Sequence, residues 1–205
     1  MGRQISQKRI IDATLAGVEK AQRFYEDASG DNWLWEGPEY LLVVHVAKAL
    51  HKLEGAKYCT LESNVHATLK DAQAVTLGAP PKRLRHKGRF DLVLWWGNGA
   101  PRAAFEFKNQ VYSYAQIAHD VARIEGVVER NAESSSFQFG AIVFYTSCLE
   151  STRNSAGDKL NARVDHLYKE LKTHVSAKAI TDLHKGKIHT EGDSAWCAVC
   201  ITLRR

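Results

Sequence analysis

The chain has 205 residues, with 28 Lys and Arg against 23 Asp and Glu, a formal net charge of +5 and a pI near 9.0. A chain of this length with 44% hydrophobic residues can bury one α/β core, and its charge favours a polyanionic partner, although the many acids exclude a pure DNA-coating protein. The sequence contains neither the ~20-residue apolar run of a membrane span nor the apolar core of a secretory signal, so we expect a cytoplasmic protein with no membrane partner.

Hydrophobic periodicity divides the chain into alternating helices and strands. Ile10, Ile11, Leu15 and Val18 are spaced as on one helix face, and Pro38 occupies a first-turn position that favours the start of a helix. In chain order the pattern predicts a helix over 5–26, a helix from 38 to about 53, a strand over 57–65, a hairpin over 89–109, a helix over 113–131, a strand over 140–146, a helix over 158–179 and a strand over 194–203.

The predicted hairpin is the most informative segment of the chain. Asn98 and Gly99 together are typical of a type I′ turn, whose central residues both need positive φ. With these two residues at the turn, Asp91 pairs directly with Glu106, and Lys108 lies two residues further along the same face. The other face is expected to be apolar and buried, formed by Phe90, Leu92, Leu94, Trp96, Phe105 and Phe107.

Two directly opposed carboxylates destabilise a plain sheet, so something must compensate their charges. A Mg²⁺ ion does this with one or two protein carboxylates and leaves its other positions to water and phosphate. Lys108 would then stabilise negative charge that develops at the phosphate. The alternative is an exposed sheet surface on which Asp91, Glu106 and Lys108 are ordinary solvated residues.

Asp91 and the Glu106-x-Lys108 pattern resemble the PD-(D/E)XK nuclease superfamily, although Phe90 replaces the proline before the first acid. The resemblance implies Asp91 and Glu106 as Mg²⁺ ligands, with Mn²⁺ able to substitute, and Lys108 as the catalytic lysine. It also implies an α/β, restriction-endonuclease-like core of helix, three strands, helix and strand over about 38–146. The N-terminal helix and the C-terminal helix and strand would be additions within a single nuclease-like domain, 1–205.

Glu39 is a further candidate for the site. Members of the superfamily often carry an extra acid on the helix before the first core strand, and Glu39 has that position. An acid at a helix N-terminus is also favoured by the helix dipole, so both interpretations stay open. Glu36 and Glu62 are weaker candidates.

The densest run of basic residues directly precedes the first predicted site strand, and we expect it to contact nucleic-acid phosphates. Gln116, on the helix after Lys108, is a candidate for supporting the site or touching the backbone of the nucleic acid, or is a solvated helix residue. Asp120, four residues later, is interpreted as a solvated helix position. The predicted nucleic-acid-binding residues are Lys82, Arg83, Arg85, Lys87, Arg89 and Gln116.

Other residues are interpreted as structural. Cys197 and Cys200 have metal-site spacing but lie in an alternating apolar run, where their thiols would point to opposite faces. Trp33 and Trp35 are expected to pack the first two helices together, the alternative being a stacking surface for a base.

The sequence therefore predicts a Mg²⁺-dependent endonuclease that hydrolyses phosphodiester bonds, with DNA favoured over RNA. Two alternatives remain, namely a non-cleaving nucleic-acid-binding or regulatory protein of the same fold, and a nuclease subunit that is active only in a larger assembly. The sequence leaves open whether the protein forms a homodimer.

Overall fold

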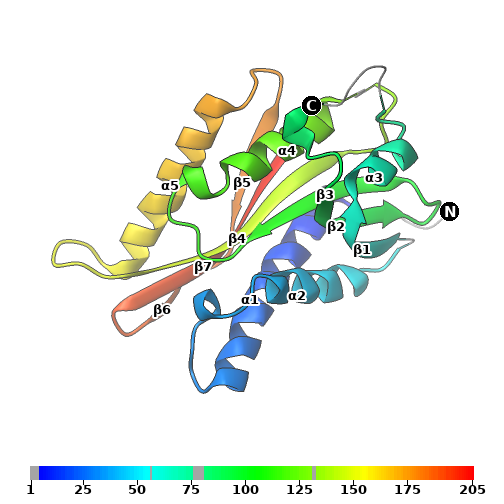
Figure 1. Cartoon of the computed structure of the whole chain (residues 1–205). Coiled ribbons are helices and arrows are strands. Elements are labelled where there is room, and N and C mark those ends of the chain that lie inside the picture. The colour runs from blue at the N-terminus through cyan, green and yellow to red at the C-terminus, as the bar shows by residue number, and fades with distance from the viewer. Residues whose placement is uncertain (1–4, 56, 76–80, 131–132) are drawn as a thin grey trace.

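The computed structural model describes residues 5–55, 57–75, 81–130 and 133–205. In these ranges one mixed sheet of seven strands is combined with five α-helices (Figure 1). The helices are α1 Gln7–Ser29, α2 Tyr40–His51, α3 Val65–Asp71, α4 Ala118–Glu129 and α5 Ala156–His174, with short 3-10 turns η1 Leu34–Glu36, η2 Lys82–Leu84 and η3 Tyr114–Gln116. The strands are β1 Lys57–Asn64, β2 Arg89–Trp96, β3 Pro101–Lys108, β4 Phe139–Leu149, β5 Ile180–Lys185, β6 His189–Glu191 and β7 Ser194–Arg204.

The sheet joins an antiparallel half to a second antiparallel half through one parallel pair. Its order is β1-β2-β3-β4-β7-β5, and β6 pairs with β7. Strands β3 and β4 are parallel and every other pair is antiparallel. A parallel pair needs a crossover connection, and α4 lies within the one that joins β3 to β4.

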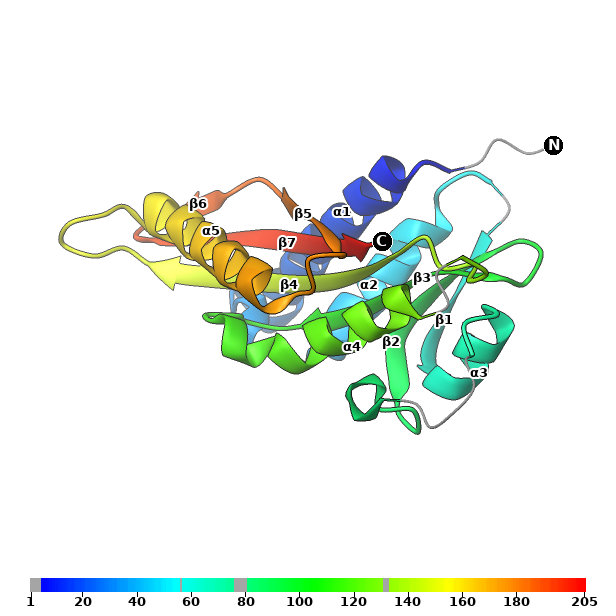
Figure 2. The same cartoon turned by 90° about the horizontal axis from the view of Figure 1, so that it is seen from above.

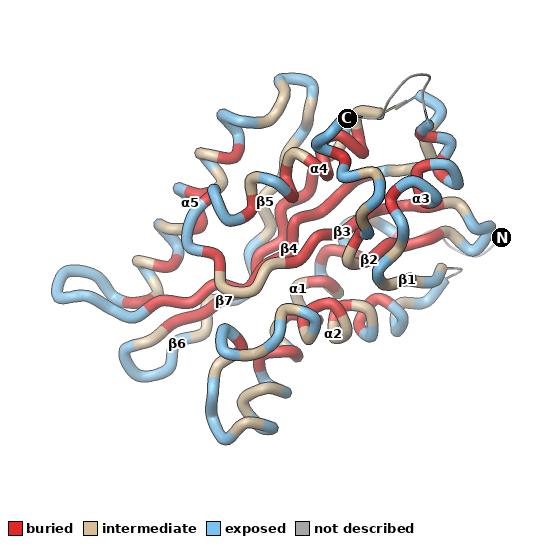
Figure 3. The backbone as a smooth tube through the Cα atoms, in the orientation of Figure 1, coloured by how far each residue is buried: buried red, intermediate tan, exposed pale blue. Residues whose placement is uncertain are grey.

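Helices cover both faces of the sheet, which gives three layers (Figure 2). One hydrophobic cluster contains side chains of α1 and α2, and the other contains side chains of α3, α4 and α5. The central strands are accordingly buried along most of their length (Figure 3). This burial explains why β4 is a nearly continuous apolar run, as expected for a strand covered on both faces.

Local sequence signals set several helix ends. Ser6 accepts a hydrogen bond from the Arg9 amide at the start of α1, and Gly30 ends this helix in the left-handed conformation.

Helix α4 approaches the sheet so closely that a Cβ at Gly140 of β4 would lie 2.4 Å from Ile124 Cγ2. Within the ranges that the structure describes, no helix is both long and apolar enough to cross a bilayer.

The prediction from the sequence is confirmed for seven elements, namely α1, α2, β1, β2, β3, β4 and β7, and in its position also for α4 and α5. Helix α4 begins at Ala118 and not at Ser113, because Tyr114–Gln116 form the 3-10 turn η3, so Gln116 lies before the helix. The C-terminal part of the predicted α5 is wrong, because the helix ends at His174 and the chain continues into β5. Helix α3 and strands β5 and β6 were not predicted. The predicted end of α4 at Asn131 lies outside the described residues.

The hairpin has the predicted register but a different turn. Leu92 pairs with Phe105 and Leu94 with Ala103, as expected. Asn98 does not have the positive φ that a type I′ turn requires, whereas Gly99 does, with φ of +86°. The register shifts between Leu94 and Trp95, and this irregularity accommodates a longer connection.

The predicted apolar face of the hairpin is wrong for Phe90 and Trp96. Leu92, Leu94, Phe105 and Phe107 pack on the α1–α2 side, but Phe90 belongs to the cluster below α3, α4 and α5. The β1–β2 register pairs Leu61 with Leu92 and Ser63 with Phe90 but leaves Asp91 unpaired between them. Glu62 on β1 has φ of +53°, so the regular alternation is interrupted beside Phe90. Trp96 is half-buried, with the Arg102 guanidinium 4.0 Å from its ring centroid.

Candidate active site

Asp91 on β2 and Glu106 on β3 bring their carboxyl groups together on the sheet face that α4 covers. The Phe107 amide donates a hydrogen bond of 2.7 Å to Asp91 Oδ2, which holds the Asp91 side chain against β3. The Asp91 and Glu106 carboxyl groups lie close enough for each to alter the pKa of the other. Burial raises the pKa of Asp91, and the Phe107 amide opposes this effect.

Arg123 on α4 is the counter-ion of Glu106. Its Nη1 lies 2.8 Å from Glu106 Oε1, and both side chains are almost fully buried. Burial and the neighbouring Asp91 raise the pKa of Glu106 to about 9, although Arg123 acts in the opposite direction. Glu106 Oε1 is buried and, despite the short ion-pair distance, accepts no hydrogen bond of normal geometry from the described residues.

Lys108 lies between two further carboxylates. Its Nζ is 3.3 Å from Glu39 Oε1 and 3.5 Å from Asp120 Oδ2. Burial alone would lower the pKa of Lys108, but the charges of Asp120 and Glu39 outweigh burial and raise it. The lysine therefore carries its positive charge within the group, with its side chain about one-third exposed.

Asn109 connects this group to the segment before α2. Its backbone amide donates to Glu39 Oε2 at 2.9 Å, and its side-chain amide donates to the carbonyl oxygens of Leu34 and Gly37. These bonds fix the end of β3 against the start of α2. Glu39 is thereby positioned from two sides, by Lys108 and by the Asn109 backbone.

The charges of this group do not balance. Among the described residues, four carboxyl groups, those of Glu39, Asp91, Glu106 and Asp120, face the two cations Lys108 and Arg123, so full ionisation would leave two negative charges. An oxygen donor set with this residual charge and a buried oxygen without a hydrogen bond suits a divalent hard cation.

The donor set is nevertheless small. In the part of the chain that the structure describes, no group of three or more His, Cys, Asp and Glu side chains is arranged to hold a metal ion. Asp91 and Glu106 make a pair, which is as many protein carboxylates as Mg²⁺ commonly uses. The predicted magnesium site therefore stays a prediction.

The structure brings together Asp91, Glu106, Lys108 and Glu39, as the sequence predicted for the site. The interpretation of Asp120 as a solvated position is wrong, because this residue is buried beside Lys108. Arg123 was missed by the sequence analysis. Asp120 and Arg123 are three residues apart and therefore neighbours on α4, but Glu125 of the same helix is buried as well, so this spacing did not by itself identify the site.

The basic segment, residues 82–89, lies beside the group. Arg123 Nη2 donates to the carbonyl oxygen of Arg89, so one arginine contacts both the segment and Glu106. The basic segment packs closely on α4. A Cβ atom added at Gly126 of this helix would lie only 2.9 Å from Leu84 Cδ2 in the segment. The predicted phosphate-contacting residues of the segment are all exposed, namely Lys82, Arg83, Arg85, Lys87 and Arg89.

Not all of these cations are equally free. Arg83 forms ion pairs with Glu125 at 3.5 Å and with Glu129 at 3.0 Å. Gln116 has a local role, because its side-chain oxygen accepts hydrogen bonds from the Tyr112 and Ser113 amides in a capping box. Its predicted contact with nucleic acid stays a prediction.

The predictions for the cysteines and for Trp33 agree with the structure, and the prediction for Trp35 does not. Cys197 and Cys200 are buried in different clusters on opposite faces of the sheet, and burial raises the pKa of each thiol to about 12. Trp33 packs against the α1–α2 cluster. Trp35 is 48% exposed.

No protein-family model matches the chain, and no curated protein or solved structure matches it either.

Proposed function

We propose that this protein is a divalent-metal-dependent nuclease of the PD-(D/E)XK type that hydrolyses phosphodiester bonds, with DNA as its favoured substrate. The observation that carries the proposal is the paired Asp91 and Glu106 carboxyl groups, with Lys108 held near them by Glu39 and Asp120. A buried acid pair with a residual negative charge costs stability, and such costs are typical of functional sites.

Asp91 and Glu106 would hold Mg²⁺, and Mn²⁺ in its place. When bound, the ion would neutralise phosphate charge and lower the pKa of a coordinated water. Lys108 would place its ammonium group against the phosphate and stabilise the negative charge that develops there during attack. Glu39 and Asp120 act as positioning residues, because both contact the Lys108 ammonium group.

The basic segment would bind the phosphate backbone beside the reacting group. Its exposed cations are joined to the candidate site through Arg123, which contacts the Arg89 carbonyl and the Glu106 carboxylate. Phosphate contacts of this kind fix the position of a nucleic acid and make its binding dependent on salt.

The test is cleavage of supercoiled plasmid, linear duplex and single-stranded DNA in Mg²⁺, Mn²⁺ or EDTA. We expect metal-dependent cutting by the wild type and a loss of at least about 100-fold in Asp91→Asn and Lys108→Ala. Glu54→Gln removes an exposed acid outside the group and should cut at the wild-type rate. Cutting that persists in Asp91→Asn and Lys108→Ala would refute the assigned site.

A second candidate function is a nucleic-acid-binding or regulatory protein that does not cut. The Arg123–Glu106 ion pair favours it, because it supplies part of the compensating charge without any metal. Salt-sensitive DNA binding without cutting by the purified wild type would select this function. Cutting that appears only with a partner chain, or only in a homodimer, would instead indicate a nuclease subunit of a larger assembly.

A further inference from the structure

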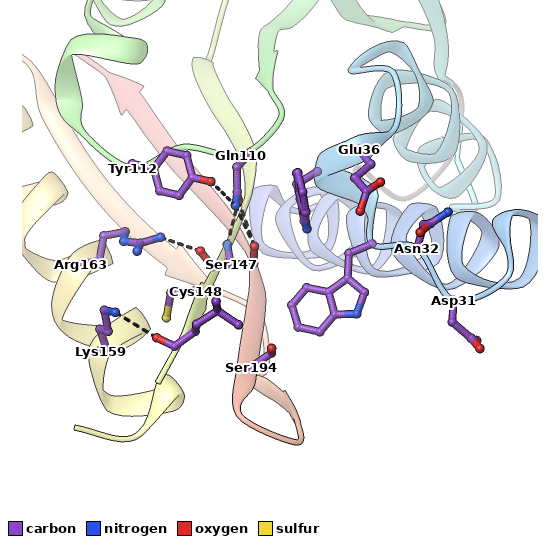
Figure 4. Close-up of a pocket in the computed structure, with 13 residues that line it drawn as sticks. Asp31, Asn32, Glu36, Gln110, Tyr112, Ser147, Cys148, Lys159, Arg163 and Ser194 are labelled. Atoms are coloured by element: carbon purple, nitrogen blue, oxygen red, sulfur yellow. Dashed lines mark hydrogen bonds between the residues drawn. The ribbon is translucent and has the colours of Figure 1, made fainter. Parts of the chain in front are cut away.

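A pocket of about 540 Å³ opens beside the candidate active site. Its lining comes from the segment between α1 and α2, from the chain after β3, from the end of β4 and from α5. Figure 4 shows Lys159 and Arg163 on the α5 side and Asp31, Asn32 and Glu36 on the opposite side. The volume is within the usual range for pockets that enclose small ligands, about 300–1,000 Å³.

The pocket and the candidate active site are built from neighbouring parts of the chain. Gln110 lines the pocket and is two residues after Lys108, while Glu36 lines it and is three residues before Glu39. Asn109 lies between the two regions and hydrogen bonds to Leu34 and Gly37 on the pocket side and to Glu39 on the other. Asn109 therefore joins the segment that lines the pocket to the residue that contacts Lys108.

Two exposed aromatic side chains give the pocket its flat surfaces. Trp35 is 48% exposed and Tyr112 is 53% exposed, and both line the pocket. The Arg163 guanidinium lies 5.0 Å from the Tyr112 ring centroid. Aromatic rings and arginine planes are the surfaces on which unpaired bases stack.

The charges of the pocket complement the two ends of a nucleotide. Lys159 and Arg163 are four residues apart on α5 and present positive charge on one side, where a phosphate would be attracted. Asp31, Asn32 and Glu36 present oxygen acceptors on the other side, which can receive hydrogen bonds from base amino groups.

We propose that this pocket binds the base of an unpaired nucleotide next to the bond that is cut. The inference rests on the proposed nuclease function and names its substrate class, DNA with a single-stranded region beside the scissile phosphate. A paired base reaches such a pocket only after leaving its stack, which costs a few kcal/mol in a duplex and least where the base is already unpaired.

The test measures binding separately from cutting. Fluorescein-labelled single strands and the matching duplex are titrated with protein in Ca²⁺, and cutting in Mg²⁺ is measured in parallel. We expect the wild type to bind the single strand more tightly than the duplex, and Trp35→Ala or Tyr112→Ala to weaken single-strand binding about ten-fold with duplex binding unchanged. Phe24→Ala is the matched control, because Phe24 is a 50% exposed aromatic residue of α1 that does not line the pocket.

The outcomes separate the inference from the proposed function. Equal affinity for both DNA forms, with single-strand binding unchanged in Trp35→Ala and Tyr112→Ala, would overturn the inference even if the protein cuts DNA. Loss of single-strand binding in these variants but not in Phe24→Ala would support the pocket even if the wild type cuts no substrate. Thermal unfolding of each variant distinguishes a lost contact from a lost fold.

Discussion

The two faces of the β2–β3 hairpin are both covered by helices, but they carry different chemistry. On the α1–α2 side, the hairpin residues are fully or almost fully buried in one hydrophobic cluster with side chains of both helices, namely Leu92, Leu94, Phe105 and Phe107. On the α4 side, the same strands carry Asp91, Glu106 and Lys108. The same hairpin therefore contributes to hydrophobic burial on one face and to an uncompensated set of charges on the other.

The face that stabilises the hairpin is therefore different from the face that carries the candidate active site. Burial of apolar side chains is favourable in proportion to their area. Burial of charges is costly unless each charge is paired and hydrogen bonded, and Glu106 has a counter-ion but an incomplete hydrogen-bond set. Truncating an apolar side chain should therefore cost mainly stability, whereas replacing Asp91 should cost mainly activity.

The largest expected effect on stability is that of Phe105→Ala. Phe105 is fully buried and its ring contacts those of Phe107 and Phe139, so the truncation leaves a cavity in the α1–α2 layer. We expect it to lower the free energy of unfolding by about 3–5 kcal/mol, measured by urea denaturation. Asp91→Asn removes a buried carboxyl group whose pKa is raised by burial, and should change stability by less than about 1 kcal/mol. Equal destabilisation by the two variants would contradict the contrast between the faces.

Arg123→Met removes the counter-ion of Glu106 and leaves a buried carboxyl group without it. We expect a loss of about 3 kcal/mol in unfolding free energy, because Glu106 loses its buried ion-pair partner and the Arg89 carbonyl loses a hydrogen bond. Adding Glu106→Gln should recover part of this loss, so the double variant should be more stable than Arg123→Met alone. Strictly additive losses in the double-mutant cycle would show that the two side chains do not interact.

The smallest expected effect concerns the basic segment and DNA affinity. Lys87→Ala removes an exposed cation and should lower the slope of log affinity against log salt concentration by about 0.9. Arg83→Ala should have less effect, because Glu125 and Glu129 already pair with Arg83. Fluorescence anisotropy over a series of salt concentrations measures both slopes. If the slope of log affinity against log salt concentration is unchanged in both variants, the basic segment does not contact DNA.

The sequence predicted the acid pair correctly although its turn prediction failed. The assumed turn set the register and strand alternation then placed Asp91, Glu106 and Lys108 on one face. The irregularity at Leu94 and Trp95 preserved this register when the connection proved longer than a two-residue turn. Alternation did not predict the position of Phe90, because regular pairing is interrupted at the neighbouring Asp91.

The contribution of α4 was not predictable in the same way. Asp120 and Arg123 become site residues only because this helix packs across β3 and β4, a contact between segments far apart in the sequence. The polar strands β5 and β6 lacked the apolar alternation that identifies a strand. The sequence showed Trp35 and Tyr112, but their common pocket depends on tertiary packing.

The most direct test of the central claim is a calorimetric titration of the wild type and Asp91→Asn with Mg²⁺ and Mn²⁺, without nucleic acid. The account predicts that the wild type binds either ion at a site that Asp91→Asn lacks, while Glu54→Gln binds as the wild type does. Equal metal binding by the wild type and Asp91→Asn, or none by the wild type, would contradict the assignment of Asp91 and Glu106 as metal ligands.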